Sequence, residues 1–291
     1  MTSDIYNVYK TGNNRIYWTD EQRDLILDLY CNQGMSSVKI GELFGLQYET
    51  ILKFLKRNGV VINGHNGVRK YTLNEHYFDV IDTPNKAYIL GFLFADGSNC
   101  KTKSTIVMSL QEEDKQILED IRNEIESEKP LEYLDYSSKH DFGYHYKNQY
   151  RLLFFSTHMC NSLENIGMIP NKSLRLDYPV IDPCFNKDFI RGYFDGDGSF
   201  TCRQVDNCKY NWLITITSTN SFCNKIYSIL SNELGVNGGI YDSSAHNNIT
   251  KVYSLSGKNQ VQAVMNWMYS GAEMFLQRKY DKYHEALSKV A

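Results

Sequence analysis

Three short stretches near the start of the chain place apolar residues at the spacing of a helix. Thr19 can cap the first of these predicted helices, because acidic residues come directly after it. Gly34 ends this helix, and the third helix is predicted from about Tyr48 to Arg57. Gly45 stands between the second and third helices, where a tight turn needs a positive φ. The apolar positions expected to face inward are Leu25, Ile26, Leu29, Tyr30, Ile40, Leu43, Ile51, Leu52 and Leu55.

A short helix, a turn with glycine and a helix with a basic outer face are typical of a helix-turn-helix. We therefore interpret residues 1–62 as a helix-turn-helix DNA-binding domain. The alternative is a three-helix cap whose outer face is only solvated. Residues 63–83 are predicted to be a linker that becomes a docking segment for the rest of the chain. The residues predicted to contact DNA from this domain are Gln47, Tyr48, Glu49, Lys53, Lys56 and Arg57.

An apolar helix that ends in Asp-Gly-Ser occurs twice in the rest of the chain. Residues 89–98 read ILGFLFADGS and residues 190–199 read IRGYFDGDGS, about 100 residues apart. The same order of elements is predicted after each copy, which divides the chain into repeats at 84–184 and 185–291. Each repeat is expected to fold as αββαββα, an α+β fold with an antiparallel sheet under helices. The strands are predicted from Ser98 to Leu110 and near Leu131–Tyr136, Tyr150–Phe155, Phe200–Val205, Trp212–Thr217, Gly239–Asp242 and Val252–Leu255, and the helices over Glu113–Ile125, Met159–Ile166, Ser221–Leu234 and Val261–Tyr269.

Small residues recur four apart along both motif helices, at Gly91 and Ala95 and again at Gly192 and Gly196. A glycine inside a helix costs about 1 kcal/mol relative to alanine, so its presence on matching faces needs a reason. Close contact between the two helices supplies one. In that case the aspartates that end the helices meet, and their like charges favour a bound cation. The alternative is that both are only cap residues before glycine turns.

The composition sets limits on the class of protein. The 291 residues are 42% hydrophobic and 22% charged, which fits a folded globular protein. No apolar run is long enough to cross a bilayer, and the polar first residues carry no signal-peptide core. Seven cysteines without CxxC pairs suit reduced thiols, so a structural zinc site is not expected. The net charge of −3 means that nucleic-acid binding would depend on local clusters of basic residues.

The paired motifs, their spacing and the predicted order of elements resemble the LAGLIDADG homing endonucleases in their single-chain, two-repeat form. The resemblance covers about residues 71–288, and the ending at 275–287 also looks like family members with an N-terminal helix-turn-helix. The first motif departs from the pattern where Phe94 replaces the first aspartate. The resemblance implies that the two sheets form a saddle on DNA, and that the second acidic residue of each motif binds metal.

Residue by residue, the resemblance implies that Asp96 and Asp197 are catalytic metal ligands. The backbone carbonyls of Ala95 and Gly196 would complete a site for Mg²⁺, or for another divalent cation such as Mn²⁺ or Ca²⁺. The family also keeps a basic and a polar residue that order the attacking water. Lys258 and Gln111 are predicted for these roles, with His158 and Ser218 as their counterparts in the other repeat. Lys101, Lys103, Thr201 and Arg203 are predicted to line the DNA.

The function implied is a site-specific double-strand DNA endonuclease that leaves short 3′ overhangs. We expect a monomer with a long, asymmetric target site, encoded by an intron or another mobile element. Its expected location is the cytoplasm of a prokaryotic or phage-infected cell, or an organelle, and it is not expected to be secreted. Two alternatives stay open: a DNA-binding regulator that no longer cuts, and an RNA maturase that helps an intron to fold.

Overall fold

The computed structural model describes residues 5–10, 16–60, 62, 71–138, 140–141, 144–170, 172–206, 209–243 and 249–290. The chain divides into two compact units, Met1–Thr72 and Leu73–Ala291. The predicted linker falls partly at 63–70, which lies outside the described residues. Each unit has a hydrophobic core of its own.

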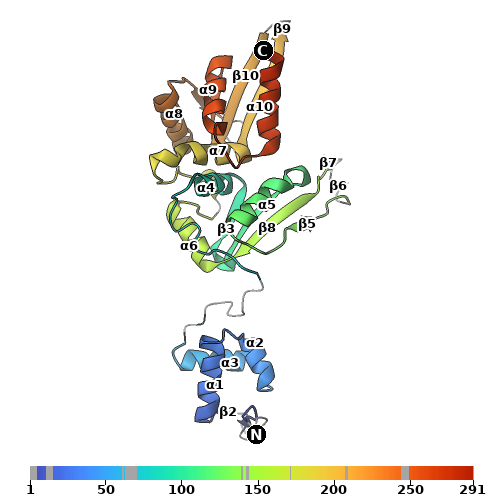
Figure 1. Ribbon diagram of the computed structural model, residues 1–291, viewed down its shortest axis with the longest axis vertical. Coiled ribbons are helices and arrows are strands. Elements are labelled where there is room, and N and C mark those ends of the chain that lie inside the picture. Colours follow the sequence, from blue (N-terminus) through green and yellow to red (C-terminus); the bar gives the residue numbers. More distant parts are fainter. Residues whose placement is uncertain are drawn as a thin grey trace. The chain divides into compact units, whose positions relative to one another are not determined.

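Three helices build the first unit (Figure 1), and they are the three that the sequence predicts. Thr19 caps the first helix in a reciprocal capping box with Gln22, which satisfies two backbone donors. Gly45 has a φ of 61°, as the turn before the third helix requires. Ile26, Ile51 and other inward positions form the core of this unit. The elements are β1 (Tyr9–Lys10), β2 (Ile16–Tyr17), α1 (Asp20–Cys31), α2 (Ser37–Leu43) and α3 (Tyr48–Arg57).

The second unit contains two four-stranded antiparallel sheets with helices packed on them, which confirms the predicted α+β class. The first repeat has the sheet order β3-β4-β8-β5, and the second has β11-β12-β10-β9. A small hairpin, β6 and β7, is inserted into the first repeat. The first repeat consists of α4 (Pro84–Asp96), β3 (Gly97–Cys100), β4 (Thr105–Gln111), α5 (Lys115–Glu124), β5 (Glu132–Leu134), β6 (His140–Asp141), β7 (Tyr144–His145), β8 (Gln149–Phe155) and α6 (Thr157–Ile166). The second consists of α7 (Asn186–Asp197), β9 (Gly198–Asp206), β10 (Lys209–Ser218), α8 (Asn220–Leu234), β11 (Gly239–Asp242), β12 (Lys251–Ser256), α9 (Lys258–Tyr269) and α10 (Gln277–Val290).

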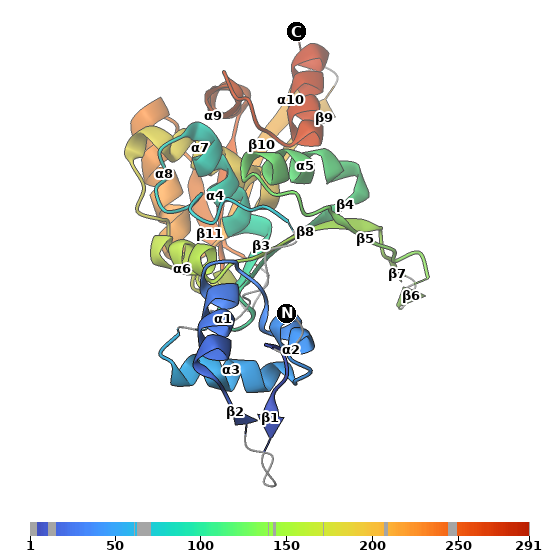
Figure 2. The ribbon, with the colours of Figure 1, turned by 60° about the horizontal axis from the view of Figure 1, so that its bottom comes forward.

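The two motif helices, α4 and α7, lie side by side where the repeats meet (Figures 1 and 2). A Cβ added at Gly91 would lie 2.1 Å from the carbonyl oxygen of Phe189, and one at Gly192 would lie 2.0 Å from that of Tyr88. Both distances are far below van der Waals contact, so only glycine allows this approach. The predicted contact between the two motif helices through their small residues is therefore confirmed.

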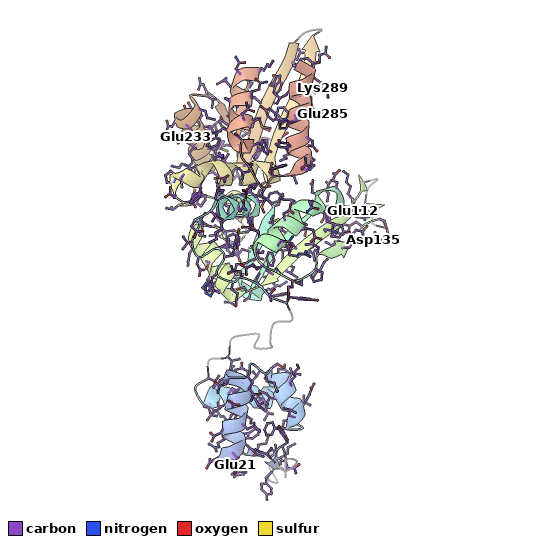
Figure 3. All side chains as sticks on the ribbon, viewed as in Figure 1. Glu21, Glu112, Asp135, Glu233, Glu285 and Lys289 are labelled. Atoms are coloured by element: carbon purple, nitrogen blue, oxygen red, sulfur yellow. The ribbon has the colours of Figure 1, made fainter. Side chains whose placement is uncertain are left out.

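Two segments outside the repeats complete the second unit. Tyr77 and Phe78, in the segment before α4, are buried in its core. Helix α10, which the sequence pattern does not predict, packs on β9 with Tyr283 buried against Phe200. Figure 3 labels Glu285 and Lys289 on α10; both are exposed and form an ion pair of 3.4 Å. In the described part of the chain, no helix is long and apolar enough to cross a membrane.

One predicted strand is different in the structure. The stretch from Ser98 to Leu110 is not one strand but the hairpin β3–β4, with a 3-10 turn at Lys101–Lys103. Ser104 closes this turn in the left-handed conformation, with a φ of 50°. Lys101 and Lys103 are thus exposed on a hairpin loop and do not alternate along a strand.

Candidate active site

Asp96 and Asp197 are the last residues of α4 and α7, and the close packing of these helices brings them together. A Cβ added at Gly196 would lie 3.1 Å from Oδ2 of Asp96, which shows how closely the carboxylate packs on the other helix. Beyond each aspartate the chain turns directly into the first strand of its repeat. Gly97 then pairs with Met108, and Gly198 pairs with Ile216. The two halves therefore present their carboxylates in equivalent positions.

The surroundings make both carboxylates harder to ionise. Burial and the charge of Asp197 raise the pKa of Asp96 to about 6, and burial raises the pKa of Asp197. Both side chains still reach solvent, so water screens part of this effect. Within the described residues, neither carboxylate accepts a hydrogen bond or forms a salt bridge. The site thus gathers negative charge that no close partner neutralises.

Two lysines that the sequence motifs do not predict lie around this pair. Lys172 follows α6 and donates to the backbone carbonyl of Ala95 at 2.7 Å. Lys279, buried in α10, donates to the carbonyls of Phe194 at 2.5 Å and Gly198 at 2.5 Å, and lies 3.4 Å from that of Gly196. Burial lowers the pKa of Lys279 to about 8 and also lowers that of Lys172. Each lysine comes from the segment after the last helix of an αββαββα repeat and binds the end of that repeat's own motif helix.

This arrangement fits a hard divalent cation. Carboxylate and carbonyl oxygens are the ligands that Mg²⁺ prefers, and Asp96 and Asp197 supply two carboxylates in one place. The carbonyls of Ala95 and Gly196 accept from Lys172 and Lys279, and each carbonyl oxygen keeps a second lone pair for an ion. A cation would also relieve the repulsion that raises the pKa of Asp96. The residues predicted as metal ligands are therefore brought together with the right chemistry.

The first aspartate of the second motif, Asp195, has a different environment. It is fully buried and accepts hydrogen bonds from the hydroxyls of Tyr88 and Tyr269 and from the backbone N–H of Leu276. These bonds link α7 to α4, to α9 and to the segment before α10. Phe94 occupies the matching position in α4 and packs on Phe189. Asp195 thus faces the protein interior, whereas Asp197 reaches solvent.

The predicted basic and polar residues lie in several places. Lys258 is exposed at the start of α9, and its charge acts on the thiol of Cys202. The charges that act on both aspartates come from Lys172 and Lys279. Gln111 is exposed at the end of β4 and accepts from Lys147 at 3.0 Å.

The two predicted counterparts also separate. Ser218 is buried at the end of β10 and accepts from the hydroxyl of Tyr193 at 3.0 Å. Burial mainly raises the pKa of Tyr193, with smaller contributions from Asp197 and Asp96, so Ser218 lies near the pair. His158 instead pairs with Asp79, at 2.7 Å. Sequence spacing therefore indicates the carboxylates, but it does not indicate the lysines beside them.

The residues predicted to touch DNA lie on exposed surfaces. In the first unit, the predicted set covers the outer side of α3 and the turn before it, and all six are exposed. In the second unit, Thr201 and Arg203 lie on β9, opposite Leu213 and Asn211 of β10. Side chains alternate along β10, so Ile214 and Ile216 are buried and the intervening side chains face the other way. The sheet of the second repeat therefore keeps one face free of helices.

Comparison with known proteins identifies part of this chain. Residues 185–266, which include α7, match the family described as LAGLIDADG-like domain. This match confirms the resemblance over the second repeat. None of the curated proteins matches the chain in sequence.

Solved structures with the same type of fold include three that illustrate the range. The full-length DUF199/WhiA structure from Thermatoga maritima is 16% identical with a TM-score of 0.44, over 75% of this chain and 65% of that one. The I-LtrWI LAGLIDADG homing endonuclease bound to target DNA is 12% identical with a TM-score of 0.44, over 75% and 96%. The I-SmaMI LAGLIDADG homing endonuclease bound to cleaved DNA is 13% identical with a TM-score of 0.46, over 72% and 89%. This chain spans just under two thirds of the length of WhiA.

Proposed function

Because residues 185–266 form a LAGLIDADG-like domain and residues 84–184 repeat its order of elements, we propose that the chain is a site-specific endonuclease that cuts both strands of duplex DNA. One observation carries the proposal. Each motif helix ends in an aspartate, at Asp96 and Asp197, and each has a lysine of its own repeat beside it, at Lys172 and Lys279. A scaffold that only binds DNA needs neither pair.

Asp96 and Asp197, with the carbonyls of Ala95 and Gly196, would hold divalent cations, Mg²⁺ or a related ion. When bound, such ions supply an activated water and neutralise charge on the leaving oxygen of the phosphodiester. The two carboxylates position this site at the point where the repeats meet, so one ligand set serves both strands. Each repeat then acts on one strand, and the cuts leave short 3′ overhangs across the minor groove.

The lysines supply positive charge where the phosphate gains negative charge in the reaction. Lys279 is held in place by the backbone carbonyls of α7 and β9, so its ammonium group needs no reorganisation. Lys172 has one such bond and is less buried. The two halves are therefore similar but not identical, and we expect the two strands to be cut at different rates.

Recognition is assigned to surfaces away from the aspartates. The free face of the second sheet is expected to contact the duplex through Thr201 and Arg203, with Lys101 and Lys103 reaching it from the β3–β4 loop. The outer face of α3 would add contacts in a major groove and lengthen an asymmetric site. Because one chain contains both repeats, a monomer suffices.

A selection on random DNA tests the proposal. The purified full-length chain is incubated with a randomised duplex library and Mg²⁺, and the ends produced are sequenced. We expect one long, asymmetric site with short 3′ overhangs. The variant Asp96→Asn/Asp197→Asn is the control, which should bind the selected site and leave it uncut. If the wild type also binds one site and leaves it intact, the chain is a regulator; if it binds structured intron RNA and cuts no DNA, it is a maturase.

A further inference from the structure

Two histidines and an aspartate meet at a second place in the second unit, apart from the paired aspartates. Asp79 lies in the segment before α4, His76 precedes it by three residues, and His158 lies in the first turn of α6. Nδ1 of His76 is 2.7 Å from Oδ2 of Asp79. Nε2 of His158 is 2.7 Å from Oδ1 and 2.9 Å from Oδ2 of the same carboxylate. One ligand atom from each residue lies within 4.8 Å of the other two.

The cluster is exposed, but the chain around it is fixed. Tyr77 and Phe78, between the two ligands of the segment, are buried in the core. On α6, His158 is flanked by the buried Met159 and by Ser156, whose side chain caps the helix. The ligands are therefore held on a firm backbone while their polar atoms stay open to solvent.

A fourth residue orients the carboxylate. Ser162 lies one turn after His158 on α6 and donates to Oδ1 of Asp79 at 2.6 Å. The rings of His76 and His158 are 4.3 Å apart between centroids and tilted by 55°. Hydrogen bonds of this kind, from residues behind the ligands, fix ligating carboxylates in metal sites.

We propose that His76, Asp79 and His158 bind a divalent transition metal of the zinc class, with solvent in the remaining position. Two imidazoles and one carboxylate form a donor set that suits zinc, cobalt or nickel, whereas Mg²⁺ prefers oxygen ligands throughout. Ligands about 2.1 Å from a tetrahedral ion lie roughly 3.4 Å from one another. The contacts to Asp79, at 2.7 Å, need to lengthen by less than about 1 Å to admit the ion.

Such an ion would join the segment before α4 to α6. The two parts are about 80 residues apart in sequence, so the cross-link would restrict the unfolded chain and stabilise the second unit. Its ligands belong to elements other than those that carry Asp96 and Asp197. The site is therefore independent of the proposed nuclease centre.

Metal binding by the full-length chain tests the inference. The protein is stripped with a chelator and titrated with Zn²⁺ by calorimetry and with Co²⁺ by visible absorption, in excess Mg²⁺ to occupy the oxygen site. The variant His76→Asn/His158→Asn removes both imidazoles from an exposed surface. The matched control is His284→Asn, an exposed histidine on α10, and Asp197→Asn tests the other site.

We expect one tight Zn²⁺ site, a Co²⁺ spectrum of a tetrahedral ion, and a melting temperature that rises with Zn²⁺ in the wild type and in both controls. The double variant should lose at least about tenfold in affinity and the spectrum, while its melting temperature in chelator stays that of the wild type. Equal Zn²⁺ affinity in the double variant, or no tight site in the wild type, would overturn the proposal and leave a hydrogen-bonded His-Asp-His cluster.

Discussion

The hydroxyl of Tyr88 on α4 donates a hydrogen bond of 2.9 Å to the buried carboxylate of Asp195 on α7. Asp195 accepts two more hydrogen bonds, from Tyr269 at 2.5 Å and from the N–H of Leu276 at 2.8 Å. One side chain thus connects both motif helices with α9 and with the segment that leads to α10 and Lys279.

Removing this acceptor should destabilise the fold. Asp195→Ala leaves three buried donors without a partner, so we expect the free energy of unfolding to fall by about 2–5 kcal/mol. Denaturant unfolding followed by circular dichroism measures the loss. The control is Glu233→Ala, an exposed position on α8 (Figure 3), which should stay within about 0.5 kcal/mol of the wild type. A similar stability for both variants would mean that Asp195 is not a structural anchor.

The contact between the motif helices makes a second prediction. A Cβ at position 192 would lie 2.0 Å from a backbone oxygen and 2.9 Å from a backbone nitrogen of α4, and neither can move aside as a side chain would. Gly192→Ala should therefore cost about 3 kcal/mol or more. Asn232→Ala, an exposed site on α8, serves as the control and should be near neutral or slightly stabilising. An unchanged melting temperature for Gly192→Ala would show that the helices do not pack this closely.

The elements and the carboxylates are predictable because their patterns are local. Helix α3 has the bounds that its sequence predicts, since its apolar positions recur every three to four residues between a glycine turn and a basic end. The spacing of Gly91 and Gly192 relative to Asp96 and Asp197 indicates the repeat. These features depend on neighbours within one or two turns.

The lysines cannot be found in this way. Lys279 reaches the end of α7 from a segment about 80 residues later in the chain, and nothing near it in sequence marks that destination. Lys258 stands out only because it follows a strand, which describes many surface lysines equally well. The usable sign is a repeat: Lys172 and Lys279 each follow the last helix of an αββαββα unit. The strand prediction for Lys101 and Lys103 is wrong because no apolar alternation defines the β3–β4 turn.

The raised pKa of Asp96 predicts how stability depends on pH without divalent cations. Its carboxyl holds a proton up to about pH 6 in the folded chain and loses it near pH 4 when unfolded. The folded state therefore binds more protons between these values, and stability falls as the pH rises through that window. Asp96→Asn removes the effect, so its melting temperature relative to the wild type should increase from pH 4 to pH 7.

A carboxyl with the opposite shift provides the control. The hydrogen bond from the backbone N–H of Cys184 lowers the pKa of Asp182, which is an exposed group. Asp182→Asn should lose a little stability relative to the wild type as the pH rises toward about 4, and the difference should stay constant at higher pH. Parallel pH profiles for Asp96→Asn and the wild type would show that water screens the pair completely.

The two lysines should act on different strands. Lys172→Met and Lys279→Met each remove one positive charge near the paired aspartates, and each charge belongs to one repeat. On the site identified by selection, we expect each variant to slow one strand by about 10²-fold or more and the other strand less, so that a supercoiled plasmid accumulates as the nicked form. Lys258→Met should cut both strands at the wild-type ratio. If it alone stops cleavage, the sequence-based assignment is right and the lysine pair is structural.

The first unit provides the last prediction, because it is a compact body with its own core and an exposed basic face on α3. Deleting residues 1–65 removes that face and leaves Asp96, Asp197 and both lysines in place. Cleavage should persist, the footprint on DNA should shorten at one end only, and affinity should fall.

The salt dependence separates DNA contact from a merely structural role. Each lost phosphate contact reduces the slope of log K against log salt by about 0.9. The variant Lys53→Ala/Lys56→Ala in the full-length chain should therefore flatten the slope by about 2, whereas Lys39→Ala on α2, an exposed lysine outside the predicted face, should leave it unchanged. If both variants keep the wild-type slope and the deletion keeps the full footprint, the three helices are a cap that does not touch DNA, and the nuclease proposal for residues 73–291 is unaffected.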